Sequence, residues 1–301
     1  MPVDARSRTI LRGWGTALVT PFMSNGDVDE QALRNLIDWQ IEEGIHFLVP
    51  CGSTGEAATL SLEEHRRVVD IAVEQVAGRV PVVAGAGSND TRKAISLSRQ
   101  MKAAGATHLL HTSPMYNKPP QRGIVAHFLA IADAVDLPLI VYNVPGRTGS
   151  NVEASTTIEL AAHENISAVK EASGNLGQIA EIIRNRPADF SVLSGDDALT
   201  LAVMAEGGDG VISVTSNVTP RLTARQVENC DENDLAGARD IAKRLSGWTS
   251  AAFVESNPVP AKAALAMMGR ISNVLRLPLV PMLESYEARL RDALHAAGAL
   301  S

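Results

Sequence analysis

Short apolar segments recur along the chain, and most are followed by a longer segment with the apolar spacing of an amphipathic helix. Three such helical segments, DEQALRNLIDWQIEEG, SLEEHRRVVDIAVEQVAG and DTRKAISLSRQMKAAG, begin with Asp or Ser and end on Gly, as helix caps do. The apolar segments predict eight strands: Thr16–Val19, Phe47–Val49, Val80–Ala84, His108–Leu110, Leu139–Tyr142, Ser167–Lys170, Ser191–Leu193 and Gly210–Val214. Strands that alternate with helices are typical of a parallel sheet.

Eight strand–helix repeats without a reversal predict an α/β protein built as a (β/α)8 TIM barrel. The alternative, an open doubly wound sheet, would usually carry a Gly-rich phosphate loop after its first strand, where this chain has TPF. After about residue 220 the pattern changes to four helical segments, 222–229, 233–253, 260–269 and 281–297. We therefore expect an N-terminal arm (1–12), a barrel (13–225) and a C-terminal helical region (226–301).

Charge and composition exclude several kinds of partner. The 301 residues carry a formal net charge of −7 without a basic tract, which argues against nucleic acid. No run of about 18 apolar residues predicts a transmembrane helix, and the N-terminus lacks the apolar core of a signal peptide. Two cysteines, Cys51 and Cys230, form no disulfide framework, so we expect a cytoplasmic protein without a membrane partner.

Lys170 stands at the end of the apolar segment ISAVK, where a buried lysine would be unusual. In a TIM barrel the reacting groups lie where strands end. Alternation along a strand places Ile166, Ala168 and Lys170 on one face, and Ile140 with Tyr142 on one face of the preceding strand. If both faces point inward, the phenol of Tyr142 and the amine of Lys170 can meet.

Such a position would suit covalent catalysis. Burial would lower the pKa of Lys170 and favour the neutral amine, which attacks carbonyl carbons to form a Schiff base. The phenol of Tyr142 could then transfer protons. The alternative is a solvated lysine at a strand end beside a packing tyrosine, and the pattern alone leaves both open.

Three other motifs carry two interpretations each. GSTGE, residues 52–56, offers hydroxyls and backbone N–H groups to a carboxylate, or is simply a tight turn. SGDD, residues 194–197, resembles a metal-binding carboxylate pair but is better explained as a helix N-cap. The histidines of HLLH, residues 108–111, are three apart and so fall on opposite strand faces, which argues against a metal site.

From residue 15 to the C-terminus the motifs GSTGEAATLS, PMYNKPPQRG, LIVYNVPGRTG, AVKEASGN, LSGDDA, GVISVTSNV and FVESNPVPAK follow in order. Together they resemble the dihydrodipicolinate synthase / N-acetylneuraminate lyase family of class I pyruvate aldolases. Within the family, the segment YNVPGRTG with Arg147 resembles the synthase branch, because neuraminate lyases generally lack this arginine. The resemblance implies condensation of pyruvate with L-aspartate 4-semialdehyde through a lysine Schiff base, in lysine and diaminopimelate biosynthesis. It also implies a homotetramer that needs no metal or organic cofactor.

Two alternatives stay open at this point. One is a pyruvate aldolase or dehydratase that acts on a sugar acid, of the N-acetylneuraminate lyase or keto-deoxy-gluconate type. The other is a non-catalytic barrel that binds a keto acid.

The resemblance also implies a role for each matching residue. Lys170 would form the imine and Tyr142 would be the general acid/base. Ser53 and Tyr116 would relay protons, Tyr116 from a neighbouring subunit. Thr54 would hold the pyruvate carboxylate and Arg147 that of the semialdehyde. Gly195 and the backbone of Ile212 would line the pocket.

One set of positions departs from the family pattern. Members inhibited by lysine tend to carry His, Glu and Tyr where this chain has Leu62, Lys93 and Met115, although His65 and Asn89 match. The cationic Lys93 would repel the ammonium groups of lysine. We therefore expect weak or absent feedback inhibition. Met115 also removes an aromatic ring from the expected subunit interface.

Overall fold

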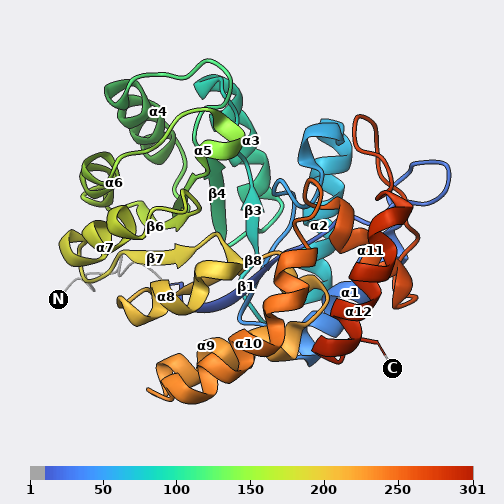
Figure 1. The fold of residues 1–301 in the computed structure, drawn as a ribbon. Helices are drawn as coiled ribbons and strands as arrows, with labels where there is room; N and C mark the ends of the chain where they lie inside the picture. Colours follow the sequence, from blue (N-terminus) through green and yellow to red (C-terminus); the bar gives the residue numbers. More distant parts are fainter. Residues whose placement is uncertain (1–10, 301) are drawn as a thin grey trace.

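Eight parallel strands form a barrel in the computed structural model, which describes residues 11–300 (Figure 1). Neighbouring strands follow the order β2-β1-β8-β7-β6-β5-β4-β3, and a parallel bridge between Leu48 and Val82 joins the two ends. The TIM barrel expected from the repeat is confirmed. The strands are β1 (Gly13–Ala17), β2 (Phe47–Val49), β3 (Val83–Gly85), β4 (His108–Thr112), β5 (Leu139–Asn143), β6 (Ile166–Glu171), β7 (Ser191–Ser194) and β8 (Gly210–Ser213).

Helices connect successive strands and cover the outside of the barrel (Figure 1). The expected caps are present: the side chains of Asp29, Ser61 and Asp90 each accept a backbone N–H in the first helical turn. The helices and 3₁₀ turns of this part are α1 (Glu30–Glu42), η1 (Ala57–Thr59), α2 (Leu62–Val76), α3 (Thr91–Ala103), α4 (Gln121–Ala134), α5 (Pro145–Thr148), α6 (Ala154–Ala161), α7 (Leu176–Asn185), η2 (Asp197–Leu199), α8 (Thr200–Ala205), η3 (Thr215–Asn217) and α9 (Pro220–Asp231).

The C-terminal helices pack on one side of the barrel, next to α1 (Figure 1). They are α10 (Leu235–Ala251), α11 (Val259–Met267), η4 (Glu284–Tyr286) and α12 (Glu287–Ala297). Trp248 of α10 is fully buried, and its indole Nε1 donates to the carbonyl of Thr215 at 3.1 Å. The boundary expected between residues 225 and 226 falls inside α9, and the division into barrel and helical region stays a prediction. Most of the expected arm, residues 1–10, lies outside the described residues.

Apolar side chains fill the barrel interior, as in other TIM barrels. This inner cluster includes Ile140, Tyr142 and Ala168, and a second cluster packs between the strands and the outer helices. Ile166 belongs to the second cluster, so the expectation that it shares the inner face of Ala168 and Lys170 is wrong. The ladder between β5 and β6 shifts register between Leu139 and Ile140, and this irregularity breaks the alternation.

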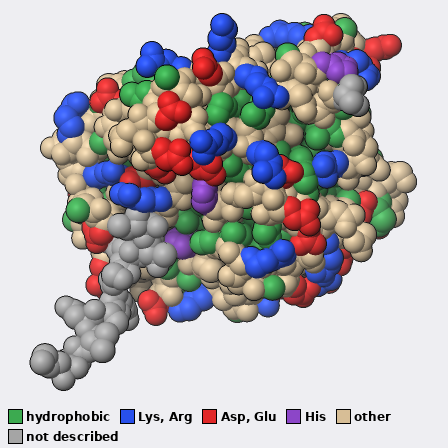
Figure 2. Space-filling view, turned by 90° about the horizontal axis from the view of Figure 1, so that it is seen from below, with side chains coloured by type: hydrophobic (Ala, Val, Ile, Leu, Met, Phe, Trp, Pro, Cys, Tyr) green, Lys and Arg blue, Asp and Glu red, His purple; other side chains and the backbone are tan. Residues whose placement is uncertain are grey.

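Acidic and basic side chains are interspersed on the face drawn in Figure 2, with apolar side chains between them. That face has no large area of one charge, in agreement with the scattered charges of the sequence. Within residues 11–300, no helix has both the length and the apolar character that crossing a bilayer would require.

Candidate active site

A cavity of about 710 Å³ opens where the strands end at their carboxyl side. Side chains from the ends of β5 and β6 and from the loops after β2 and β7 line it. Six of the eight expected site residues meet there: Lys170, Tyr142, Ser53, Thr54, Arg147 and Gly195. These residues are spread over more than 140 positions of the sequence, and the barrel brings them together at one rim.

Lys170 lines the cavity, and its side chain is buried. Only 4% of the residue is exposed, so the interpretation of a solvated strand end is wrong. Desolvation lowers its pKa to about 7; the charge of Asp197 opposes this shift and that of Arg147 adds to it. At neutral pH a large share of the amine is therefore unprotonated and nucleophilic.

Tyr142 lies beside Lys170 on the neighbouring strand. The two residues are paired in the ladder of β5 and β6, and the Lys170 Nζ lies 4.2 Å from the centroid of the phenol ring. Burial raises the pKa of Tyr142 to about 12, and Arg147 partly offsets this. The phenol thus keeps its proton at neutral pH and is available as a proton donor.

Gly195 follows β7 and leaves room for the lysine side chain. A Cβ at this position would lie 3.0 Å from Cγ and Cε of Lys170 and 2.8 Å from Cβ of Ala172. Any other residue here would push against Lys170, since contacts this short are sterically unfavourable. The glycine therefore shapes the cavity through the absence of a side chain.

The GSTGE loop leaves β2 and contributes Ser53 and Thr54 to the cavity wall. Thr54 is buried, and its Oγ1 accepts from Asn257 Nδ2 at 2.9 Å. A Cβ at Gly85 would lie only 2.0 Å from the carbonyl oxygen of Cys51. Gly85 is the last residue of β3, and its lack of a side chain allows the loop after β2 to approach the β3 backbone closely.

Arg147 extends from α5 at the cavity edge, where it is exposed. Its Nη2 donates to the carbonyl of Asn257 at 3.2 Å. Asn257 thus contacts both Thr54 and Arg147, although sequence analysis did not identify it. The available signal was its place in the motif FVESNPVPAK, because all the other motifs of that series had yielded candidate site residues.

The two carboxylates of SGDD have separate roles. Asp196 accepts the N–H of Ala198 at 2.9 Å and caps η2, which confirms the N-cap interpretation. Asp197 accepts from Ser213 Oγ, from Thr215 Oγ1 at 2.6 Å and from the N–H of Val214 at 3.0 Å. It holds the end of β8 beside the cavity, a role that sequence analysis missed. Within residues 11–300, no group of three or more His, Cys, Asp or Glu is arranged to hold a metal ion.

Two expected site residues do not line the cavity of their own chain. Tyr116 is 89% exposed and has a left-handed backbone with φ of 70°. Ile212 of β8 is fully buried within the inner cluster of the barrel. Their expected roles stay predictions.

The fold and the cavity together define a TIM-barrel enzyme with a desolvated lysine at the carboxyl ends of its strands. A family model, the dihydrodipicolinate synthetase family, matches residues 10–297. The chain belongs to this family, as its motifs had indicated.

Relatives of known name agree with the assignment. The 4-hydroxy-tetrahydrodipicolinate synthase of Nitratidesulfovibrio vulgaris is 53% identical over 288 residues, which cover 95% of this chain and 98% of that relative. The dihydrodipicolinate synthase structure from Thermotoga maritima has a TM-score of 0.95 at 41% identity, covering 97% of this chain and 100% of that one. The chloride-inhibited enzyme of Acinetobacter baumannii, complexed with pyruvate, has a TM-score of 0.94 at 41% identity, covering 96% and 99%. These likenesses confirm the expected synthase function and lyase class.

Proposed function

We propose that Lys170 binds pyruvate as an imine and that the resulting enamine condenses with L-aspartate 4-semialdehyde. The observation that carries this proposal is the buried Lys170 amine, whose pKa is about 7 and which lies beside the phenol of Tyr142. The likeness to a family member complexed with pyruvate supports the choice of the first substrate.

The proposed reaction begins when the neutral amine of Lys170 attacks the carbonyl carbon of pyruvate. Tyr142 gives a proton to the developing alkoxide, and loss of water from the carbinolamine forms the imine. The Tyr142 phenolate then takes a proton from the methyl carbon, and the resulting enamine attacks the aldehyde carbon, whose oxygen receives that proton from Tyr142. Finally the amine of the semialdehyde adds to the imine carbon, and this addition closes the ring. Loss of the Lys170 amine from that carbon then releases the cyclic product.

The proposed substrate contacts follow from the positions of Thr54 and Arg147. Thr54 is a buried residue of the cavity wall, and its hydroxyl and backbone N–H would bind the pyruvate carboxylate. Arg147 stands at the exposed edge, where its planar guanidinium suits the carboxylate of the incoming semialdehyde. Ser53, which also lines the cavity, would pass protons between Tyr142 and Tyr116.

We propose further that the active assembly is a homotetramer in which Tyr116 reaches the cavity of a neighbouring subunit. The 89% exposure of this ring and its strained backbone support a role outside its own chain. Sedimentation would show the assembly. Mixing Tyr116→Phe protein with Lys170→Met protein, after subunit exchange, should restore activity, because some cavities would then hold both native residues. Failure to restore activity would argue against the shared site.

The buried Cys51 and half-buried Cys230 are both free thiols, which agrees with the proposed cytoplasmic location. Cell fractionation tests that location.

One experiment tests the chemistry directly. The protein is incubated with pyruvate, reduced with borohydride and digested for mass spectrometry. A reduced pyruvate adduct on Lys170, absent from Lys170→Met protein, is expected. If the adduct forms, release of the cyclic product on addition of L-aspartate 4-semialdehyde tests the second substrate.

A further inference from the structure

The GSTGE loop ends at Glu56, whose position is unfavourable in two respects. Its side chain has no exposed surface, and its backbone is left-handed, with φ of 53° and ψ of 34°. A buried carboxylate needs partners, and a left-handed residue other than glycine persists only where its surroundings fix it. The contacts that hold Glu56 therefore also hold the loop.

Two residues of the C-terminal region bind the two carboxylate oxygens of Glu56. Lys262 of α11 donates from Nζ to Oε1 at 2.6 Å, and the backbone N–H of Arg276 donates to Oε2 at 3.1 Å. The Lys262 side chain also has no exposed surface, and its Nζ lies 4.1 Å from the centroid of the Phe22 ring. This ammonium and carboxylate are fully removed from water and depend on each other.

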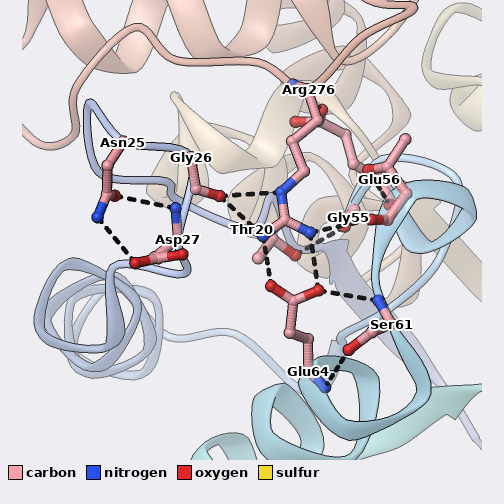
Figure 3. Close-up of polar contacts among 10 residues, drawn as sticks. Thr20, Asn25, Gly26, Asp27, Gly55, Glu56, Ser61, Glu64 and Arg276 are labelled. Atoms are coloured by element: carbon pink, nitrogen blue, oxygen red, sulfur yellow. Dashed lines mark hydrogen bonds and ion pairs between the residues drawn. The ribbon is translucent and has the colours of Figure 1, made fainter.

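Arg276 is itself fixed by several contacts (Figure 3). Its guanidinium donates to the carbonyl of Gly26 at 2.7 and 2.9 Å, to the carbonyl of Thr59 at 2.9 Å and to the carboxylate of Glu64. The backbone N–H that meets Glu56 thus comes from a segment tied to the start of α2 and to the loop before α1.

The same C-terminal region touches the loop a second time. Asn257, five residues before Lys262, donates to the hydroxyl of Thr54. Glu56 in turn donates its N–H to the carbonyl of Ser53 at 3.2 Å. Because the loop is only five residues long, fixing Glu56 and Thr54 also fixes the backbone that carries Ser53, and the Asn257 contact holds the Thr54 hydroxyl.

We infer that the buried pair of Glu56 and Lys262 positions the GSTGE loop for binding of the pyruvate carboxylate. The two are positioning residues, since they act through Thr54 and contact no reacting atom. This inference rests on the proposed function. A pair that served stability alone would change the melting temperature but not the affinity of the folded protein for pyruvate.

The test measures the pyruvate concentration that gives half-maximal borohydride trapping on Lys170. Three variants are compared: Lys262→Met, Glu56→Gln and the double variant, which leaves no unpaired buried charge. Each should raise this concentration about tenfold or more while the maximal trapping rate stays within about threefold, the signature of lost ground-state binding. If Lys262→Met does not fold, the half-saturating pyruvate concentrations of the double variant and of the isosteric Glu56→Gln variant test the inference.

The control is Arg186→Met, which breaks the ion pair of the half-buried Arg186 with the buried Asp209. Asp209 directly precedes β8 and so lies at the opposite end of the barrel from the cavity. It should lower the melting temperature and leave the half-saturating pyruvate concentration unchanged. Wild-type half-saturation in folded Lys262 and Glu56 variants would overturn the positioning role. Absence of any adduct in the wild type would instead overturn the proposed function on which the inference rests.

Discussion

Tyr142 and Lys170 face each other across two adjacent strands, with the lysine Nζ 4.2 Å from the centre of the tyrosine ring. The pairing of the two residues is set by the ladder of a parallel sheet and not by a loop. The strands are buried on both sides and cannot shift without breaking the barrel. The phenol and the amine are therefore held together before any substrate arrives, which is the preorganisation that covalent catalysis requires.

The pH dependence of imine formation should reflect the lowered pKa of Lys170. Only the unprotonated amine attacks pyruvate, and that form increases as pH rises through about 7. The initial rate of borohydride trapping should therefore rise between about pH 6 and 8 and then level off. Asp197 raises this pKa, so Asp197→Asn should move the midpoint to lower pH. A midpoint near 10.5 in the wild type would contradict the burial argument.

Lys170→Met should abolish the adduct and make the fold more stable. Because the folded-state pKa of Lys170 lies below its unfolded value of 10.5, folding releases a proton between about pH 7 and 10.5. The contribution of Lys170 to the free energy of unfolding therefore rises with pH across that window. At neutral pH, burial of this amine lowers the free energy of unfolding by about 4 kcal/mol. Thermal unfolding should show a higher melting temperature for Lys170→Met at pH 7. The gain should disappear above about pH 10.5.

Tyr142→Phe should lower kcat by a factor on the order of 10² to 10⁴, because it removes only the proton donor. The ring that packs beside Lys170 stays, so the variant should fold and bind pyruvate. Steady-state kinetics together with trapping would separate the two effects. A kcat within about twofold of the wild type would show that the phenol transfers no proton in the slow step.

Arg147→Met should weaken use of the second substrate while the pyruvate adduct still forms. Loss of the guanidinium removes a partner for the semialdehyde carboxylate, so KM for L-aspartate 4-semialdehyde should rise at least about tenfold. Arg184→Met on α7 is a matched control, since that arginine is also exposed and does not line the cavity. An unchanged KM for the semialdehyde in Arg147→Met would show that Arg147 does not bind this substrate.

Lysine should inhibit the enzyme weakly or not at all. Leu62 is exposed, and Lys93 is a cation where lysine-sensitive relatives are expected to carry an acid. Initial rates measured over a series of lysine concentrations test this. Inhibition at sub-millimolar lysine would contradict the prediction. Replacing Leu62, Lys93 and Met115 together with His, Glu and Tyr should increase sensitivity.

The sequence by itself determined the local structure of this protein and the two central side chains. The helical and strand periodicities located all eight strands, and Asp29, Ser61 and Asp90 marked helix starts correctly. Alternation along two neighbouring strands placed Tyr142 and Lys170 together. These features depend on spacing along a few residues, which a single sequence records directly.

Only the tertiary structure decided how the GSTGE loop is held. Asn257, Lys262 and Arg276 reach this loop from about 200 residues further along the chain. The register shift that turned Ile166 outward depends on how β6 pairs with β5. Such contacts follow from closure of the barrel and packing of the C-terminal helices on it. No local spacing encodes which distant side chain meets a buried carboxylate, because that choice is made by the shape of the packed interior.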